Sequence, residues 1–297
     1  MNLEPVRVVA PPPGMLTKPP GYFVVGTGPP IVMLHSSLSS KSQWAPLAER
    51  LASRFRVIAL DLCGYGDSAM PSRKASFTLD DEVALITDNL DRLVDANVRV
   101  HVVGHSYGAL VALRFAQCHG DRVASLSLYE PVAFRLLNDN DTALINVRTF
   151  AEVVQRLIAA GRRRDASQVF VDFWSGDGSY ASLPPPAQIS ITRHIDKVPL
   201  DFQAAMHWLL GPADLRRIVA PTLLLSGTRS PSVVQRIVTV LSWALPDSRH
   251  PGAFDAGHMG PITDPARVNP WIEAFMDICA GREIVRTASH TVLSQPL

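Results

Sequence analysis

The sequence has few cysteines, no long apolar run and no excess of charge, and each absence excludes a class of protein. Three cysteines, Cys63, Cys118 and Cys279, in 297 residues suit neither a disulfide framework nor a zinc site, which predicts a reduced, cytoplasmic setting. No run approaches the roughly 18 consecutive apolar residues of a membrane helix, so we expect no membrane span. The N-terminal segment also lacks the apolar stretch of a secretory signal peptide.

Charge of either sign is nearly balanced. The 28 basic and 27 acidic residues leave a formal net charge of +1, so no surplus positive charge is available for a phosphate backbone, and we expect no nucleic-acid partner. Hydrophobic residues make up 47% of the chain and charged residues 19%, a balance that excludes intrinsic disorder. The composition predicts a folded, enzyme-sized chain and carries no indication of its oligomeric state.

Proline is abundant, at 24 positions. Six prolines fall within residues 1–20, which predicts an extended arm with short edge strands at most, at Val6–Val9 and just beyond it at Tyr22–Val25. Residues 281–297 show no core pattern and are expected to form a tail.

Short apolar runs alternate with amphipathic segments before Pro131 and again after residue 213. The expected strands are Ile31–His35, Arg56–Asp61, Val98–Gly104, Arg122–Glu130, Pro221–Gly227 and Ser248–Ala253. The expected helices between and after them are Gln43–Ser53, Asp80–Ala96, Ser106–Gln117, Ser232–Leu245 and Val268–Ala280. This alternation predicts an α/β fold with a mostly parallel, doubly wound sheet and helices on both faces.

Residues 132–213 interrupt the alternation. They contain no strand-like run but four helical ones, at Leu144–Ala160, Ala166–Trp174, Pro186–Ile195 and Leu200–Leu210. Residues 1–131 and 214–297 are therefore expected to form one core, and residues 132–213 a helical insertion in it.

The most informative motif is Gly104-His105-Ser106-Tyr107-Gly108. It lies between an expected strand and an expected helix, where a nucleophile elbow presents a serine on a strained turn beside a helix N-terminus. We predict that Ser106 is the nucleophile. His105, the residue before it, is expected to pack under the turn.

Two further segments supply partners for such a serine. His258 follows the last expected strand and is the predicted general base. The segment His35-Ser36-Ser37 ends the first buried strand, and the backbone N–H groups of Ser37 and Tyr107 are predicted to form the oxyanion hole. Residues 61–68 are expected to form a structural turn without direct chemistry.

From Tyr22 to about Ala280 the sequence resembles the α/β-hydrolase superfamily. His35-Ser36-Ser37 resembles its His-Gly oxyanion loop, residues 61–68 (DLCGYGDS) its Asp-x-x-Gly-x-Gly-x-Ser segment, residues 104–108 its elbow, and the insertion its helical cap domain. The resemblance implies one catalytic triad shared by serine esterases, lactonases, carbon–carbon bond hydrolases and cofactor-free haloperoxidases. Related epoxide hydrolases and haloalkane dehalogenases need an aspartate nucleophile, so Ser106 argues against both.

The sequence departs from the family at two places. Ser36 stands where the family usually has glycine, and the loop at residues 227–231, which normally carries the triad acid, has Ser230 in its place. Glu130 ends a strand 24 residues after the nucleophile, where some members of the family carry their acid, and it is the predicted acid of this triad. The alternatives are a hinge role for Glu130 and an acid role for Asp255.

These residues predict a serine hydrolase that acts on a small-molecule ester or lactone without metal or cofactor. The open alternatives are a carbon–carbon bond hydrolase, a cofactor-free haloperoxidase-like enzyme, or a hydrolase-fold binding protein without activity. Six apolar residues of the insertion are candidates to line an apolar pocket, although at least half are expected to pack against the core. They are Phe170, Phe173, Trp174, Phe202, Met206 and Trp208.

Overall fold

The computed structural model describes residues 21–293. Residues 1–20, with the edge strand expected at Val6–Val9, and residues 294–297 lie outside the described residues. Among the described residues, no helix has the length and hydropathy needed to cross a membrane.

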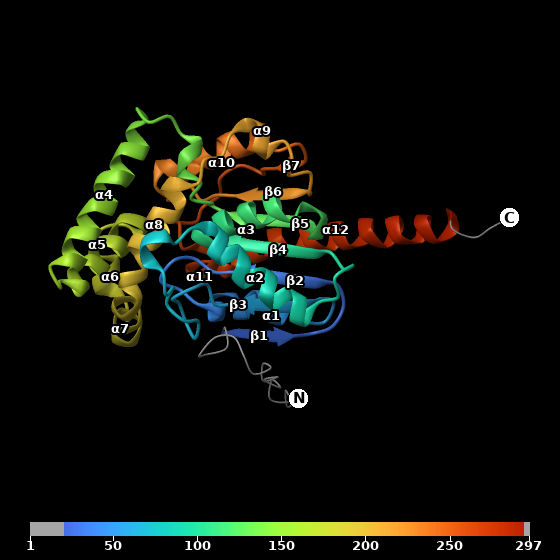
Figure 1. The fold of residues 1–297 in the computed structure, drawn as a ribbon, viewed down its shortest axis with the longest axis horizontal. Coiled ribbons are helices and arrows are strands. Elements are labelled where there is room, and N and C mark those ends of the chain that lie inside the picture. The colour runs from blue at the N-terminus through green and yellow to red at the C-terminus, as the bar shows by residue number, and fades with distance from the viewer. Residues whose placement is uncertain (1–20, 294–297) are drawn as a thin grey trace.

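A single seven-stranded sheet forms the centre of the molecule (Figure 1). Its spatial order is β1-β3-β2-β4-β5-β6-β7; β1 runs antiparallel to β3 at one edge and every other pair is parallel. The strands are β1 (Tyr22–Val25), β2 (Pro30–Leu34), β3 (Arg56–Leu60), β4 (Val100–His105), β5 (Val123–Tyr129), β6 (Thr222–Leu225) and β7 (Ser248–Arg249). The mostly parallel sheet predicted from the sequence is confirmed.

Helices cover both faces of the sheet, as expected, because alternate strand residues are buried on opposite sides. Val32 and Leu34 of β2 face one hydrophobic core, which takes in α2 (Leu79–Leu93), α3 (Tyr107–Cys118) and α10 (Ser232–Ala244). Ile31 and Met33 face a second core on the other side, with α1 (Ala45–Leu51) and α12 (Pro265–Leu293).

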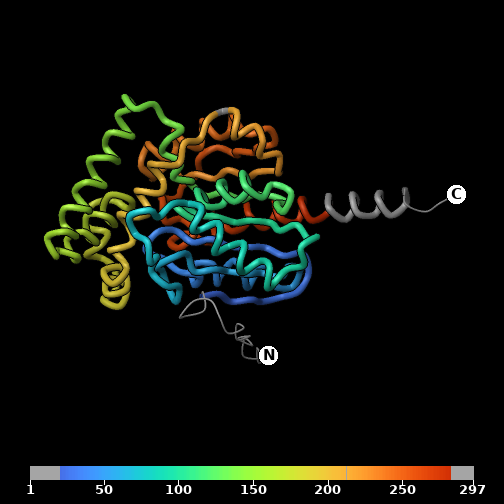
Figure 2. Tube along the Cα trace, viewed as in Figure 1, coloured from blue at the N-terminus to red at the C-terminus, as the bar shows by residue number. Residues whose placement is uncertain are grey.

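The chain between β5 and β6 contains helices and no strand. Its α-helices are α4 (Thr142–Ala159), α5 (Arg163–Ser175), α6 (Ser179–Ser182), α7 (Pro185–His194), α8 (Val198–His207) and α9 (Pro212–Leu215). Figure 1 shows α4 to α8 gathered at one end of the sheet, and Figure 2 shows the chain leaving the sheet for this group and returning to it. We call residues 132–213 the helical insertion.

Short elements complete the fold. They are the 3₁₀ turns η1 (Lys41–Trp44), η2 (Lys74–Ser76), η3 (Gly120–Arg122), η4 (Phe134–Leu136) and η5 (Ile195–Lys197), and the helix α11 (Gly260–Thr263). The strand expected over Ser248–Ala253 is wrong in length, since β7 has two residues. Pro251 has no N–H to donate, and Gly252 turns the backbone with φ 92°, so the ladder ends early.

Candidate active site

The nucleophile elbow forms where β4 turns into α3. Ser106 lies between them with φ 54° and ψ −115°, a conformation that costs a non-glycine residue on the order of 1–3 kcal/mol. Its N–H donates to the Tyr129 carbonyl at 2.9 Å, and its carbonyl accepts from Ala109 and Leu110 at 3.1 Å. The hydroxyl group is thereby fixed at the N-terminus of α3, at the carboxyl end of the sheet.

The two glycines of the motif are required by close backbone packing. A Cβ on Gly104 would lie 2.6 Å from the Ala109 Cα, and a Cβ on Gly108 would lie 2.4 Å from the carbonyl oxygens of Leu34 and His35. Neither neighbour is a flexible side chain that moves aside. The glycines therefore let α3 start directly against the ends of β4 and β2.

The structure brings Ser106 and His258 together although 152 positions separate them in the sequence. The Ser106 Oγ donates to the His258 Nε2 at 2.9 Å, and the imidazole is 2% exposed. A neutral imidazole with its acceptor nitrogen toward a serine hydroxyl is the arrangement of a general base.

Glu130 is the carboxylate that contacts this histidine. The His258 Nδ1–H donates to the Glu130 Oε2 at 2.6 Å, and the backbone N–H of Gly227 donates to the Oε1 at 2.7 Å. Glu130 directly follows β5, is fully buried, and has a positive φ of 46°. The loop at residues 227–231 lacks the usual triad acid, but its Gly227 N–H donates a hydrogen bond to Glu130, at the end of the neighbouring strand β5.

The other candidates for the triad acid lie elsewhere. Asp255 is 60% exposed and forms ion pairs with Arg229 and Arg267. The buried Ser230 Oγ has no hydrogen-bond partner among the described residues. Neither side chain contacts the imidazole of His258, and Glu130 does.

The loop that carries His258 is held by the ends of β4 and β5. The His105 Nε2 donates to the His258 carbonyl at 2.7 Å, and the Tyr129 hydroxyl donates to the Gly257 carbonyl at 2.7 Å. Burial lowers the pKa of His105 well below its ordinary value, so this imidazole stays neutral. His105 packs under the turn, as the sequence suggested, and in addition positions the backbone of the predicted base.

The two residues expected to form the oxyanion hole lie close to Ser106 in space. Ser37 and Tyr107 line the same cavity as Ser106. Tyr107 is the first residue of α3, so its N–H has no acceptor within the helix. Ser37 lies in the tight turn after β2, and the next residue, Leu38, has φ 60°.

The departure at Ser36 does not disturb this turn. Ser36 is not among the residues with positive φ, and its N–H and hydroxyl donate to the Gln43 Oε1 at 3.2 and 3.1 Å. The preceding His35 donates from Nδ1 to the Ser36 carbonyl at 2.7 Å and accepts at Nε2 from the Leu62 N–H at 3.0 Å. Both imidazole nitrogens are used, which requires the neutral form.

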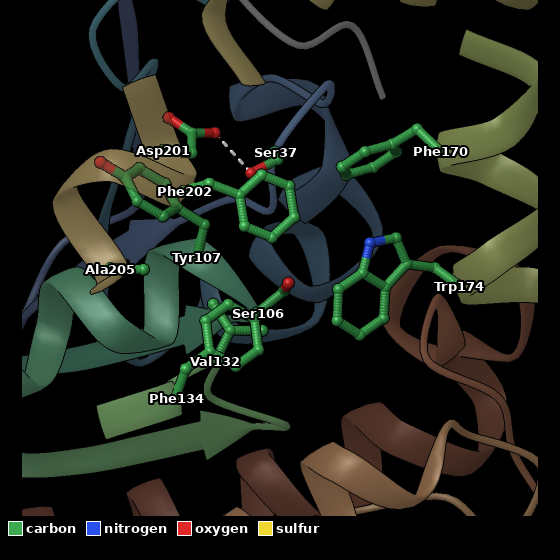
Figure 3. A pocket seen from close by; sticks show the side chains of 10 residues that line it. All are labelled: Ser37, Ser106, Tyr107, Val132, Phe134, Phe170, Trp174, Asp201, Phe202 and Ala205. Carbon is green, nitrogen blue, oxygen red and sulfur yellow. Dashed lines mark hydrogen bonds between the residues drawn. The ribbon is translucent and has the colours of Figure 1, made fainter. Parts of the chain in front are cut away.

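A narrow cavity with a free volume of about 20 Å³ lies above Ser106, between the sheet and the helical insertion (Figure 3). Asp201 provides the one charged side chain among the described residues that line it. The full lining is Ser37, Ser106, Tyr107, Val132, Phe134, Phe170, Trp174, Asp201, Phe202 and Ala205. Of the six apolar candidates from the insertion, three line the cavity, and Phe173, Met206 and Trp208 pack against the core instead.

Trp174 of α5 covers the imidazole of His258. The two rings stack with centroids 4.4 Å apart and an angle of 26° between their planes. The indole face is electron-rich and attracts a cation placed over it. This contact between the insertion and the histidine loop places the indole face against the ring of the predicted base.

A buried cluster of charged and phenolic side chains borders the cavity, and the sequence indicated only Ser37 among its members as a site residue. Lys197 is fully buried and donates to Asp201 of α8 and, at 3.1 Å, to Glu82 of α2. Tyr65 and Ser37 also donate to Asp201, each at 2.5 Å. The residues come from four distant segments, so no local motif reveals them. We call these five residues the Asp201 cluster.

No group of His, Cys, Asp or Glu side chains within the part of the chain that the structure describes is arranged to hold a metal ion. The buried histidines His35, His101, His105 and His258 each bond to carbonyl, N–H, hydroxyl or carboxylate partners of the protein itself.

Comparison with known proteins identifies the family. The model of the alpha/beta hydrolase family matches residues 31–271, most of the chain, so this protein belongs to the alpha/beta hydrolases. An uncharacterized protein of Mycobacterium tuberculosis is 27% identical over 312 aligned positions, covering 98% of this chain and 89% of its own length. A haloalkane dehalogenase of Agrobacterium fabrum is 36% identical over 107 residues, 36% of this chain and 34% of that protein.

Solved structures show the same fold. An alpha/beta hydrolase from Sphaerobacter thermophilus superimposes with a TM-score of 0.62 and 26% identity, covering 79% of this chain and 88% of that one. A thermophilic esterase from Thermogutta terrifontis has a TM-score of 0.68 and 24% identity, covering 88% and 94%. The resemblance predicted from the motifs is confirmed, and the relatives span several hydrolase activities.

Proposed function

We propose that this protein is a serine hydrolase that cleaves a carboxylic ester or lactone through an acyl-enzyme intermediate. The observation that carries the proposal is the continuous hydrogen-bonded series from Ser106 through His258 to Glu130, with distances of 2.9 and 2.6 Å. A haloalkane dehalogenase or epoxide hydrolase mechanism requires a carboxylate nucleophile, and the elbow carries a serine. The series supplies what an acyl transfer needs, which is a nucleophile, a base and a group that orients the base.

In the proposed first step, His258 takes the proton of Ser106 while the Ser106 Oγ attacks the carbonyl carbon of the ester. The backbone N–H groups of Ser37 and Tyr107 would donate to the oxyanion, and the N-terminus of α3 adds partial positive charge there. Glu130 would hold the Nδ1–H tautomer and stabilise the imidazolium.

In the second step, His258 returns the proton to the leaving alcohol oxygen, the bond between that oxygen and the carbonyl carbon breaks, and the acyl-enzyme remains. Water then attacks the acyl carbon, with His258 as its base, and Ser106 leaves protonated. No step requires a metal or a cofactor.

The cavity supports a small, uncharged and apolar acyl group. Its free volume is small, about 20 Å³, and aromatic rings of Phe134, Phe170, Trp174 and Phe202 form its walls. An anionic acyl group would lose its hydration against these apolar walls without gaining a cationic partner, because Lys197 already pairs with Asp201. We therefore also propose that residues 132–213 act as a cap domain that limits the substrate in size and charge.

The test uses a fluorophosphonate probe and p-nitrophenyl esters. We expect the purified protein to be labelled and Ser106→Ala to lose both labelling and hydrolysis, by about 10⁴-fold or more. Ser127→Ala is the matched control, since this serine is also buried, lies on β5 and has no partner for its hydroxyl among the described residues. A wild type that neither labels nor cleaves any ester contradicts the proposal and leaves the binding-protein alternative.

A substrate panel separates the enzyme alternatives. p-Nitrophenyl butyrate and the anionic p-nitrophenyl hemisuccinate have acyl groups of nearly equal length, and we expect the neutral butyrate to be strongly preferred. Short acyl chains should exceed octanoate, and a γ-lactone is included. Faster turnover of an anionic carbon–carbon bond substrate, or peroxide-dependent halogenation without ester cleavage, would favour the other members of the family.

A further inference from the structure

The Asp201 cluster connects the helical insertion to the turn that carries the expected oxyanion hole. Asp201 lies on α8, and its Oδ2 accepts from the Ser37 hydroxyl at 2.5 Å, across 164 positions of sequence (Figure 3). No other residue of the insertion donates to or accepts from Ser37 in the described part of the chain. This bond is therefore a direct link between the insertion and the turn after β2.

The carboxylate of Asp201 accepts hydrogen bonds from three side chains. Ser37 and Tyr65 donate to one of its oxygens and Lys197 to the other. Burial, together with the charge of Asp201, raises the pKa of Tyr65 well above its ordinary value, so the phenol keeps the proton that it donates. The carboxylate is held rigidly, and a rigid acceptor can hold Ser37 in turn.

Lys197 offsets the charge of Asp201 in the protein interior. Burial alone lowers the pKa of Lys197, but the carboxylates of Asp201 and Glu82 outweigh that effect and raise it. The ammonium group also lies 4.3 Å from the centroid of the Phe77 ring and 5.0 Å from that of Tyr107. The negative charge of Asp201, close to the expected oxyanion, is therefore paired with the positive charge of Lys197.

The position of Ser37 makes this link relevant to the reaction. Ser37 lines the cavity with Ser106, and the backbone beyond it is strained, with φ 60° at Leu38. The hydroxyl of Ser37 has one proton, and that proton points to Asp201, so the N–H remains as the Ser37 donor for an oxyanion. Fixing the side chain at one end restricts the rotation of the peptide group that carries this N–H.

We propose that Asp201 is a positioning residue for the oxyanion hole: by holding the Ser37 hydroxyl, it makes the helical insertion part of the machinery that aims the Ser37 N–H at the substrate carbonyl. The inference rests on the proposed function of the site. It assigns to the insertion a role in the rate of the chemical step, beyond the walls of the cavity.

The experiment compares kcat and KM for p-nitrophenyl butyrate in Ser37→Ala, Ser37→Thr and Asp201→Asn. Ser37→Ala keeps the backbone N–H and removes the link. We expect kcat to fall about 10- to 100-fold with KM changed less than about threefold, since complete loss of one oxyanion donor costs about 10²–10³. Ser37→Thr retains a hydroxyl group and should recover most of the lost kcat. Ser42→Ala, an exposed serine of the same segment, should leave both constants unchanged.

The double variant Ser37→Ala/Asp201→Asn tests whether Asp201 acts through Ser37. If it does, the double variant has the kcat of the slower single variant, because the same link is removed twice. Asp201→Asn also weakens the pairing of Lys197, so folding is checked by circular dichroism. If this variant does not fold, Ser37→Ala and Ser37→Thr decide alone, since Tyr65 and Lys197 still satisfy Asp201 in both.

An unchanged kcat in Ser37→Ala, or fully multiplicative losses in a folded double variant, would overturn the inference while the proposed function stands. Loss of kcat in both Ser37→Ala and Ser37→Thr to the same extent would also overturn it, because the hydroxyl would then not be the group that matters. A wild type that neither labels nor cleaves overturns the proposed function and this inference with it.

Discussion

Glu130 contributes two separate hydrogen bonds from a single strained position. With φ at 46°, its backbone turns sharply after β5, and the side chain reaches both the imidazole of His258 and the backbone N–H of Gly227. A carboxylate can accept at both oxygens, whereas an amide at the same place can accept at only one. The pairing with His258 therefore depends on the charge and on the symmetry of the carboxylate.

We expect Glu130→Gln to lower kcat by about 10²- to 10⁴-fold in ester hydrolysis, because a neutral side chain neither stabilises the imidazolium nor enforces its tautomer. Asp255→Asn is the control, since that exposed carboxylate forms ion pairs with Arg229 and Arg267 at the surface. A loss below about tenfold in Glu130→Gln would assign the acid role to another group.

The sequence indicated Ser106, His258 and Glu130 because each has a local signature: an elbow motif, a histidine after the last strand, and a carboxylate at a strand end. Asp201 and Lys197 have none. Their partners Ser37 and Glu82 are 164 and 115 positions away, so only the folded chain brings them together. Sequence patterns report local structure, and this cluster depends on long-range packing.

At the scale of elements, the contact between α3 and β2 determines where the nucleophile lies. α3 begins at Tyr107, one residue before Gly108, which packs against the carbonyl oxygens of Leu34 and His35. Those carbonyls belong to the strand that leads into the Ser37 turn. One glycine thus sets the distance between the elbow and the turn.

We expect Gly108→Ala to lower the free energy of unfolding by about 3 kcal/mol or more, because its Cβ would overlap backbone atoms that cannot move aside. Gly120→Ala is the control: no heavy atom lies within 4 Å of its Cβ position. Urea unfolding of both variants measures the difference. Equal stability of the two would contradict the packing argument.

Most elements could be predicted because buried strands are short apolar runs and surface helices are amphipathic. The ends were less predictable. The strand expected over Ser248–Ala253 is cut to Ser248–Arg249, and a single bridge between Gly227 and Phe254 replaces the rest of the ladder. The helix expected over Val268–Ala280 begins earlier, at Pro265, since proline is tolerated in a first helical turn. It also continues to Leu293, so residues 281–293, which were expected to form a tail, belong to α12.

At the scale of the whole molecule, buried histidines make stability depend on pH. Burial lowers the pKa of His35 from its ordinary value near 6.5 to about 4, and it lowers that of His105 in the same direction. Both are neutral in the folded protein at neutral pH. In the unfolded chain they bind protons once the pH falls below about 6.5.

Stability should therefore be complete above pH 6.5 and decline as the pH falls toward 4, because the unfolded state binds more protons in that window. We expect a loss on the order of 1 kcal/mol per pH unit for each histidine, measured by urea unfolding between pH 7 and 5. In His35→Gln the slope should be shallower. An identical slope in the variant would show that other groups control the pH dependence.

The architecture as a whole was predictable where it follows from alternation of strands and helices. The order of the strands in the sheet and the position of the helical insertion at one end of it depend on long-range packing, and no local pattern predicts them. The close approach of Trp174 to His258 depends on how α5 packs against the rest of the fold, and no sequence spacing predicts it.

That stacked pair has a consequence for spectroscopy. A protonated imidazole quenches the fluorescence of an indole in van der Waals contact with it, and a neutral imidazole does so far less. Because the rings of Trp174 and His258 lie face to face with centroids 4.4 Å apart, the emission of this tryptophan reports the charge of the histidine. The difference in emission between the wild type and Trp174→Phe isolates the signal of this tryptophan and would show when His258 gains a proton.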